Sequence, residues 1–438
     1  MLTNSIELDL TEPKPARSGA RAIFGWCLYD WAISPFPTIV STFIISNYYA
    51  KAIAPDPTTG SAQWSLMIAL AGIAIALFSP PLGAIADRMG HAKRGIAIGL
   101  SVVVLAGGLI WFAKPYPAYG LPLLIVSGLG IVAMELGMLF YNALLPGVAP
   151  AARIGRVSGW GWASGYFGGL ICMGVALVLL VQPEHPVFGI PRTEAANYRA
   201  AGPLAAIWAA MFGWPLFLLV KDIPKTGLKL TVAVREGLTD TWHTLRDLRQ
   251  TPQLAWFLAA SAIYRDGVTS ILTLGGLYAG GTFGMDINQL TMFGMGLLIS
   301  AGLGAATFAW LDDRIGSKRT IILSLLGLIA FGAAIVLVHN KAWFVGIALG
   351  LGIFVGPAQA ASRSLAVRLA PEGQVGKVFG LYALTGRAVT FIGPTMFYWV
   401  TESTLSQRAG LASILILLIV GLTLLTRVKE PEIGRAHV

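Results

Sequence analysis

The chain has 438 residues, of which 55% are hydrophobic and 12% are charged, and its formal net charge is +10. A soluble globular domain is usually about a quarter charged, so this composition excludes an ordinary soluble protein and indicates a polytopic membrane protein. The two cysteines, Cys27 and Cys172, lie in apolar stretches and support neither a disulfide framework nor a metal site. The first 20 residues are mixed and polar, so we expect no cleaved signal peptide.

Twelve apolar runs follow one another along the chain, and each reaches the roughly 17–25 residues that a helix needs to cross a bilayer core. Only helices and closed barrels satisfy their backbone polar groups in lipid. Barrel strands would be shorter than these runs and would alternate apolar with polar residues. The predicted fold is therefore an all-α membrane protein with twelve transmembrane helices. The runs cover residues 22–49, 62–86, 95–113, 120–146, 157–181, 203–220, 253–282, 288–311, 320–339, 342–367, 378–400 and 409–426.

The basic residues predict the orientation of these helices. With the N-terminus placed in the cytoplasm, the inner segments hold 22 of the 31 Lys and Arg residues and the outer segments hold six. This is a strong positive-inside bias. We therefore expect a multi-pass protein with both termini in the cytoplasm.

The longest predicted cytoplasmic loop, 221–251, divides the chain. Its stretch "LTDTWHTLRDLR" repeats Leu and Trp at helical spacing, which predicts an amphipathic helix on the membrane surface. An internal repeat supports the division, because the stretch from Asn142 aligns without gaps with the stretch from Arg363, and "DRMGHAKR" resembles "DRIGSKRT". Such a duplication predicts two pseudo-symmetric six-helix halves. The expected parts are a cytoplasmic tail (1–21), an N-terminal half (22–220), the linker (221–251), a C-terminal half (252–427) and a second cytoplasmic tail (428–438).

Several motifs resemble those of one transporter class. The loop "GAIADRMGHAKR" from Gly83 is similar to the signature loop of the major facilitator superfamily, and "LDDRIGSKR" from Leu311 resembles its degenerate second copy. A narrower set resembles the vacuolar amino-acid effluxers related to autophagy and their bacterial relatives. This set comprises "YDWAISPF", "NALLP", "SGWGWASGYFGG", "YRDG", "SRSL" and "GLYALTGRAVTFIGP".

The resemblance implies a gradient-coupled carrier, with protons as the expected coupling ion and amino acids as the best-known substrates of the eukaryotic members. It further implies a bacterial inner (plasma) membrane protein with the major facilitator fold, no cofactor and a monomeric state. It also implies a gate at Asp87 and Arg88, repeated at Asp313 and Arg314. There Asp87 is expected to meet an Arg or a helix N-terminus of the other half and to stabilise the outward-facing state; the alternative is a solvated charged turn.

Six ionisable residues lie within the apolar runs. A charged residue at the centre of a membrane helix costs roughly 2.5–3.5 kcal/mol on insertion scales, so such residues are expected to face a water-filled cavity or each other. Five of the six lie deep in their runs, whereas Arg363 lies a few residues from the cytoplasmic end and is expected to snorkel. The deep residues are Asp30, Glu135, Arg265, Asp266 and Arg387.

We expect these five residues to bind substrate or to couple protons. An Arg can hold a carboxylate through two parallel hydrogen bonds, and a carboxylate can hold an ammonium group or the coupling proton, so the set suits a zwitterion. Glu135 is the strongest candidate for coupling, because no basic residue lies within one turn of it; the alternative is a neutral, hydrogen-bonded carboxyl in a helix interface. For Arg265 and Asp266 the alternative is pairing with charges on other helices.

Uncharged residues near these charges carry further expectations. Tyr29 and Tyr264 either stack on a ligand or pack in the core. Pro35 and Pro37 are expected to kink the first helix just after Asp30. The glycines at 161, 165 and 169 recur at a spacing of four, which predicts close packing of the fifth helix against a neighbour.

Other functional classes fit the sequence less well. The chain contains no HExxH, nucleophile elbow or Walker loop, so an enzyme is not expected. A channel would not need two repeated gating loops, and the basic residues are topological, which argues against nucleic-acid binding. Within the carrier class, drugs and other organic solutes are the alternative to amino acids or peptide-like substrates.

Overall fold

The computed structural model describes residues 19–224, 239 and 251–431, and these residues form helices and connecting turns without any β-strand. The amphipathic helix predicted from Leu238 lies outside this part of the chain, apart from Thr239. The predicted all-α fold is confirmed, since every predicted run overlaps one helix or a short series of helices.

The first bundle of helices comes from the N-terminal half of the chain, and the second from the C-terminal half. The first contains α1 (Ala20–Ile33), α2 (Ile45–Tyr48), α3 (Pro57–Met89), α4 (Ala92–Ile110), α5 (Gly120–Ala143), α6 (Leu145–Val148), α7 (Ile154–Ala176), α8 (Ala196–Arg199), α9 (Ala201–Gly213) and α10 (Pro215–Leu219). The second contains α12 (Pro252–Phe283), α13 (Ile287–Ile315), α14 (Ser317–Leu337), α15 (Lys341–Leu369), α16 (Val375–Val389), α17 (Ile392–Thr404) and α18 (Gln407–Thr426).

Ten helical segments of the described residues are long and apolar enough to cross a membrane. The remaining two predicted spans differ from these for visible reasons. The span 22–49 is divided into shorter helical pieces. The span 253–282 lies in the 32-residue helix α12, whose Arg265 and Asp266 lower its mean hydropathy.

The prolines interrupt the first span, as predicted. Helix α1 ends at Ile33, and a π-helical segment, Pro37–Phe43, continues the span. Pro35 has no N–H, so the carbonyl of Trp31 loses its intrahelical donor. That carbonyl instead accepts a hydrogen bond from Trp208 Nε1 of α9 at 3.3 Å. The break is therefore stabilised by packing within the first half.

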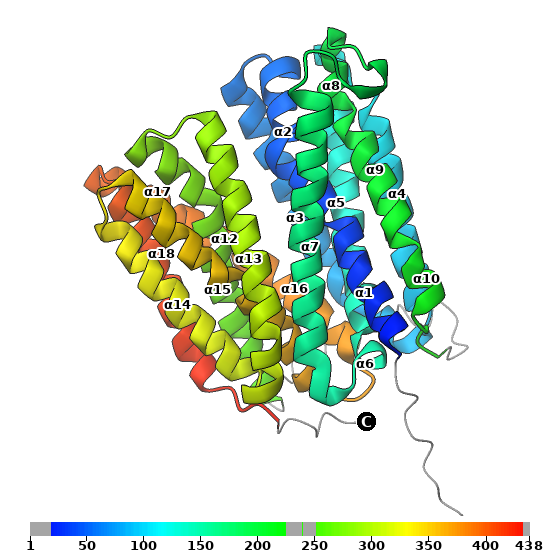
Figure 1. Cartoon of the computed structure of the whole chain (residues 1–438). Helices are drawn as coiled ribbons and strands as arrows, with labels where there is room; N and C mark the ends of the chain where they lie inside the picture. The colour runs from blue at the N-terminus through cyan, green and yellow to red at the C-terminus, as the bar shows by residue number, and fades with distance from the viewer. Residues whose placement is uncertain (1–18, 225–238, 240–250, 432–438) are drawn as a thin grey trace, which may run out of the picture.

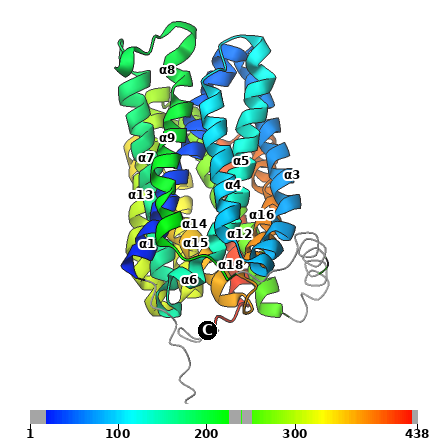
Figure 2. The ribbon, with the colours of Figure 1, turned by 90° about the vertical axis from the view of Figure 1, so that its right-hand side faces the viewer.

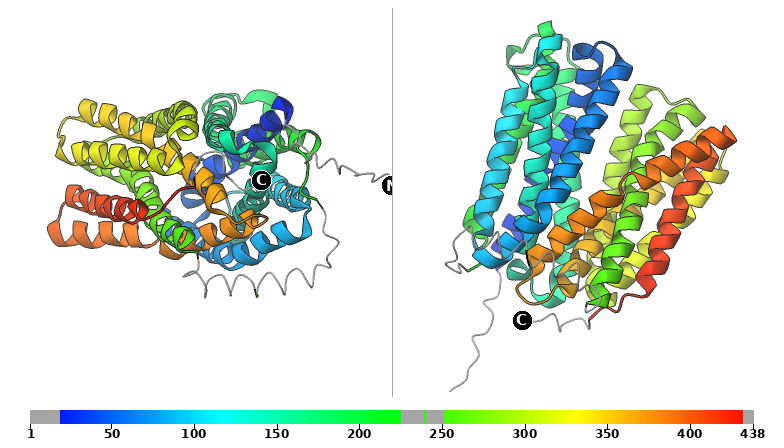
Figure 3. Two further views of the ribbon diagram at one scale, coloured as in Figure 1. Left: turned by 90° about the horizontal axis from the view of Figure 1, so that it is seen from below. Right: turned by 180° about the vertical axis from the view of Figure 1, so that it is seen from behind.

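The two bundles meet near one end of the molecule and diverge toward the other (Figure 1). The start of α1 and the end of α18 lie at the end where they meet, which we call the termini end. In Figure 2 the helices of the first half run side by side along the long axis. Viewed from the termini end, the two groups lie next to each other, with part of the α16 segment between them (Figure 3).

Of the helix pairs that join the halves, α3 with α16 and α7 with α13 pack most extensively. Glycine makes both approaches possible. A Cβ on Gly83 of α3 would lie 2.2 Å from the carbonyl oxygen of Gly376 on α16, and a Cβ on Gly159 of α7 would lie 2.5 Å from the Cβ of Ala309 on α13. Any larger residue at either position would push the halves apart, which is the role of small residues in membrane helix packing.

Candidate functional site

A cavity of about 500 Å³ lies between the two halves. Helices α1, α5 and α7 of the first half and α12, α13, α15 and α16 of the second contribute to its wall. All five deep charges predicted from the sequence line it, together with Arg363. The described lining therefore carries three carboxylates and three guanidinium groups, and it contains neither Lys nor His. The carboxylates are those of Asp30, Glu135 and Asp266, and the guanidinium groups are those of Arg265, Arg363 and Arg387.

Glu135 of α5 forms an ion pair with Arg387 of α16, with Oε1 and Nη2 3.2 Å apart. No basic residue lies within one turn of Glu135 on its own helix. The partner comes from the other half. The two side chains are 38% and 28% exposed, so water screens their attraction.

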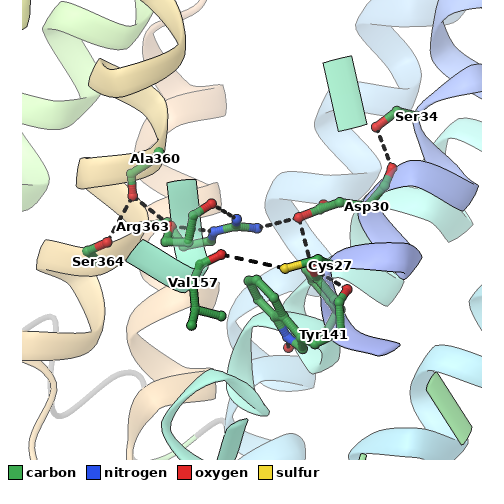
Figure 4. Close-up of polar contacts among 10 residues, drawn as sticks. Cys27, Asp30, Ser34, Tyr141, Val157, Ala360, Arg363 and Ser364 are labelled. Atoms are coloured by element: carbon green, nitrogen blue, oxygen red, sulfur yellow. Dashed lines mark hydrogen bonds and ion pairs between the residues drawn. The ribbon is translucent and has the colours of Figure 1, made fainter. Parts of the chain in front are cut away.

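Asp30 and Arg363 form a second ion pair between the halves, and this pair is buried (Figure 4). Arg363 Nη1 lies 3.1 Å from Asp30 Oδ2, which also accepts a hydrogen bond from the Tyr141 hydroxyl at 2.8 Å. Arg363 additionally donates to the Ser158 hydroxyl at 2.9 Å and to the Ser158 carbonyl at 2.6 Å, and its guanidinium lies 4.7 Å from the centre of the Trp26 ring.

The prediction that Arg363 snorkels to the membrane surface was wrong. Its side chain is 4% exposed, because it extends into the opposite half rather than toward solvent. The sequence places it in the motif "SRSL", but nothing in the spacing indicates which way it points. The sequence also gave no reason to select its partners Tyr141 and Ser158. Tyr141 directly precedes the "NALLP" motif, and Ser158 begins "SGWGWASGYFGG".

Arg265 and Asp266 are neighbours on α12 with separate surroundings. The guanidinium of Arg265 lies over the Tyr382 ring at 3.9 Å and donates to the Tyr382 carbonyl at 3.2 Å. Asp266 is 3% exposed, and its Oδ2 accepts the backbone N–H of Gly393, near the start of α17, at 2.8 Å. Its Oδ1 is buried without a hydrogen-bond partner. Within the described residues, neither side chain has an ion-pair partner inside 4.0 Å. The alternative that each pairs with an opposite charge on another helix is therefore not realised.

The two tyrosines have different positions. Tyr264 lines the cavity, and its hydroxyl lies 2.6 Å from that of Ser362. Tyr29 is buried in the core against Tyr141, with ring centres 5.0 Å apart, and does not contribute to the cavity wall. Of the two alternatives for Tyr29, the structure therefore favours packing in the core. It directly precedes Asp30, and adjacent helical residues point about 100° apart.

The repeated loops contact the opposite half in equivalent ways. Asp87 accepts the backbone N–H groups of Gly376 and Lys377 at the start of α16, at 2.6 and 2.7 Å. Asp313 accepts the backbone N–H of Arg156 at the start of α7 at 3.0 Å, and its Oδ2 lies 3.2 Å from Arg156 Nε. The sequence repeat aligns Arg156 with Lys377, so the two contacts are related by the duplication.

The basic residues that follow these two aspartates have different surroundings. Arg88 is half-buried, whereas Arg314 is exposed. A carboxylate at a helix N-terminus is favourable because the first N–H groups of a helix lack intrahelical acceptors. The acidic residue of each loop therefore makes the inter-half contact that the resemblance implied for Asp87.

A family model described as "Vacuole effluxer Atg22 like" matches residues 57–435. The chain belongs to this family. Over 410 residues it is 25% identical to "Uncharacterized MFS-type transporter YxiO" of Bacillus subtilis, an alignment that covers 92% of this chain and 94% of that protein. It is 24% identical to "Autophagy-related protein 22" of Yarrowia lipolytica over 347 residues, which covers 72% of this chain and 56% of that protein.

Solved structures show the fold of this Atg22-like transporter. The proton:xylose symporter XylE superposes with a TM-score of 0.73 at 13% identity, covering 94% of this chain and 96% of that one. The transporter FucP in its outward conformation superposes with a TM-score of 0.69 at 15% identity, covering 94% and 99%. The Atg22-like chain is thus a multi-pass membrane transporter of the major facilitator superfamily, and family membership confirms the prediction of a carrier rather than an enzyme.

Proposed function

We propose that this transporter moves a small zwitterionic solute, an amino acid or a peptide-like molecule, by alternating access, and that protons drive the movement. The observation that supports this proposal is the cavity between the halves, whose lining carries three carboxylates and three guanidinium groups. A lining without net charge suits a solute that carries both signs. Binding sites between two repeated halves near the middle of the bilayer are typical of secondary transporters.

Arg265 is the proposed anchor for the carboxylate of the solute. Its guanidinium has no acidic partner within 4.0 Å among the described residues, and the Tyr382 ring beneath it holds it in place. A solute carboxylate can therefore bind without first displacing a protein carboxylate. The bidentate geometry of Arg makes this contact directional.

Glu135 is the proposed partner for the ammonium group of the solute. It lies in the same cavity and is the more exposed member of its ion pair with Arg387. The cost of replacing Arg387 by an ammonium group is small, because an ion pair that is partly exposed is typically worth about 0–1 kcal/mol.

Asp266 is the proposed proton carrier. An ionised carboxylate that is buried without a cationic partner is costly, and a proton removes that cost. Asp266 meets this condition in the described residues, whereas Glu135 and Asp30 have Arg partners. These contacts support Asp266, rather than Glu135, as the proton carrier.

Amphipathic organic solutes, including drugs, are the second candidate substrates. The same cavity has an apolar side that would accept them, and an amino acid with an apolar side chain would use it as well. This side includes Ile33, Met134, Met138 and Leu139. Methionine side chains adapt to ligands of different shapes.

Reconstitution of the purified transporter tests the proposal. A thermal-shift screen against amino acids, dipeptides and common antibiotics first selects a ligand, and counterflow of that ligand is then measured in proteoliposomes. We expect zwitterions to raise the melting temperature of the transporter and to show counterflow. A channel would not produce counterflow. Arg265→Ala should abolish the shift, whereas Arg314→Ala, which removes an exposed guanidinium outside the cavity, should leave it unchanged. Stabilisation by antibiotics alone would favour the second candidate.

A further inference from the structure

Arg363 is bound by the half of the molecule to which it does not belong. It extends from α15 of the second half, yet Asp30 lies on α1 and Ser158 on α7, both in the first half. The rings of Trp26 and Tyr141, also in the first half, lie beside the guanidinium. In the described residues, Asp30 is the one carboxylate within 4.0 Å of Arg363. The charge is therefore satisfied only while the halves are together.

A second hydrogen bond at the same place also crosses between the halves. The Ser158 hydroxyl donates to the carbonyl of Ala360, one turn before Arg363, at 2.8 Å. The guanidinium and this hydroxyl thus tie α15 to α7 and α1. Arg363 lies six residues before the end of α15, about 9 Å from the termini end of that helix at about 1.5 Å per residue. The cluster therefore lies on the termini side of the cavity that Asp30 and Arg363 both line.

We infer that Arg363 is the latch residue of the transport cycle: its ion pair with Asp30 holds the halves together on the termini side of the cavity, and it must separate before that end can open. This inference rests on the alternating access proposed above. It assigns a role to Arg363, which has none in the proposed binding and coupling of the solute. Unlike the contacts of Asp87 and Asp313, the latch lies in the wall of the cavity itself. It therefore connects the solute site to the closure.

Two glycines of α7 provide a matched test of the latch. A Cβ on Gly161 would lie 2.5 Å from Asp30 Oδ2 and 2.7 Å from Arg363 Nη2, so Gly161→Ala should force the ion pair apart. A Cβ on Gly165 would lie 2.6 Å from Ser34 Oγ, in the same interface between α7 and α1. Its distances to Asp30, 3.4 Å to the backbone oxygen and 3.7 Å to Cβ, are ordinary van der Waals contacts, and Arg363 is not among its nearest atoms. Gly165→Ala therefore disturbs helix packing within the first half to a similar degree and spares the latch.

The experiment measures the two ends of the full-length transporter separately by pulsed electron spin resonance. Both native cysteines are replaced by serine, one spin-label pair is placed at positions 152 and 372 at the termini end, and another at 61 and 403 at the opposite end. All four positions are exposed. These distances are measured without any solute, so the result does not depend on whether a zwitterion is the substrate.

With the latch in place, the 152–372 distance should be mostly short and the 61–403 distance mostly long. Gly161→Ala and Arg363→Ala should each raise the long-distance population at 152–372 by about tenfold or more, because a buried ion pair that loses its geometry or one partner is strongly destabilised. Arg363→Lys should give an intermediate shift. A lysine keeps the positive charge but cannot reproduce the separate guanidinium contacts with Asp30 and with the hydroxyl and carbonyl of Ser158. Gly165→Ala should match the parent.

Two results would overturn the latch. One is an unchanged 152–372 distribution in Gly161→Ala and Arg363→Lys, and the other is an equal shift in Gly161→Ala and Gly165→Ala. Size-exclusion chromatography and the melting temperature show which variants are folded, and Arg363→Lys carries the test if an alanine variant is not. If the parent shows no zwitterion counterflow but the variants show the expected distance shifts, the proposed substrate is refuted and the inference about the latch still holds.

Discussion

Replacement of Asp266 by asparagine tests the proposed proton-carrying role of this residue and preserves its hydrogen bond to the backbone. Asparagine keeps a side-chain oxygen that can accept the N–H of Gly393, a bond of 2.8 Å in the structure, but it cannot be deprotonated to carry a proton. Asp266→Ala is the contrasting change, because it leaves that N–H without an acceptor and should lower the free energy of unfolding by about 1–3 kcal/mol. Asparagine should therefore change coupling with little change in stability.

The expected accumulation of solute follows from the number of protons that move with each solute molecule. Asp266 is the one carboxyl group in the described cavity lining without a cationic partner, so we expect one proton for each solute moved. A difference of one pH unit then stores about 1.4 kcal/mol and supports about a tenfold concentration ratio of the solute. In Asp266→Asn this ratio should fall to one.

The assay uses proteoliposomes and the solute selected by the thermal-shift screen. Accumulation is measured with a pH difference of one unit, and counterflow is measured at equal pH on both sides. Asp266→Asn should retain counterflow and lose accumulation, whereas Glu135→Gln should retain pH-driven accumulation with weaker binding. An Asp266→Asn variant that still accumulates solute tenfold would refute this reasoning, and a Glu135→Gln variant that alone loses accumulation would assign the proton to Glu135.

Three further predictions concern other contacts of the structure. Asp87→Asn and Asp313→Asn should each increase opening of the termini end in the spin-label measurement, since each loses a charged acceptor at a helix N-terminus; a shift in only one of them would contradict the equivalence of the two loops. Arg387→Ala should tighten solute binding by up to about fivefold, because it removes the cation that the ammonium group must displace from Glu135, a contact typically worth about 0–1 kcal/mol; weaker binding in Arg387→Ala would contradict this exchange of partners. Tyr29→Phe should leave the KM for transport unchanged, because the ring packs in the core; a raised KM would place Tyr29 at the solute site.

The positions of the spans could be read from the sequence because they depend on local composition. Lipid selects stretches that are apolar over about 20 residues, and it does so whatever surrounds them. The repeat from Asn142 and Arg363 anticipated the equivalence of the two inter-half contacts, since duplicated sequences place corresponding residues at corresponding depths. The break after Asp30 was equally local, because Pro35 cannot donate a backbone hydrogen bond.

What only the tertiary structure decided is which charge meets which. Glu135 and Arg387 are 252 positions apart, and Asp30 and Arg363 are 333 positions apart. The sequence of a single helix fixes the depth and the angular position of a residue on that helix, through the rise of about 1.5 Å and the turn of about 100° per residue. It does not fix which helix lies opposite or how the halves are rotated against each other. For that reason Arg363 was mistaken for a surface residue, and a ligand contact and core packing both stayed open for Tyr29. Asp266 could be identified as the carboxyl without a cationic partner only once the helices were packed.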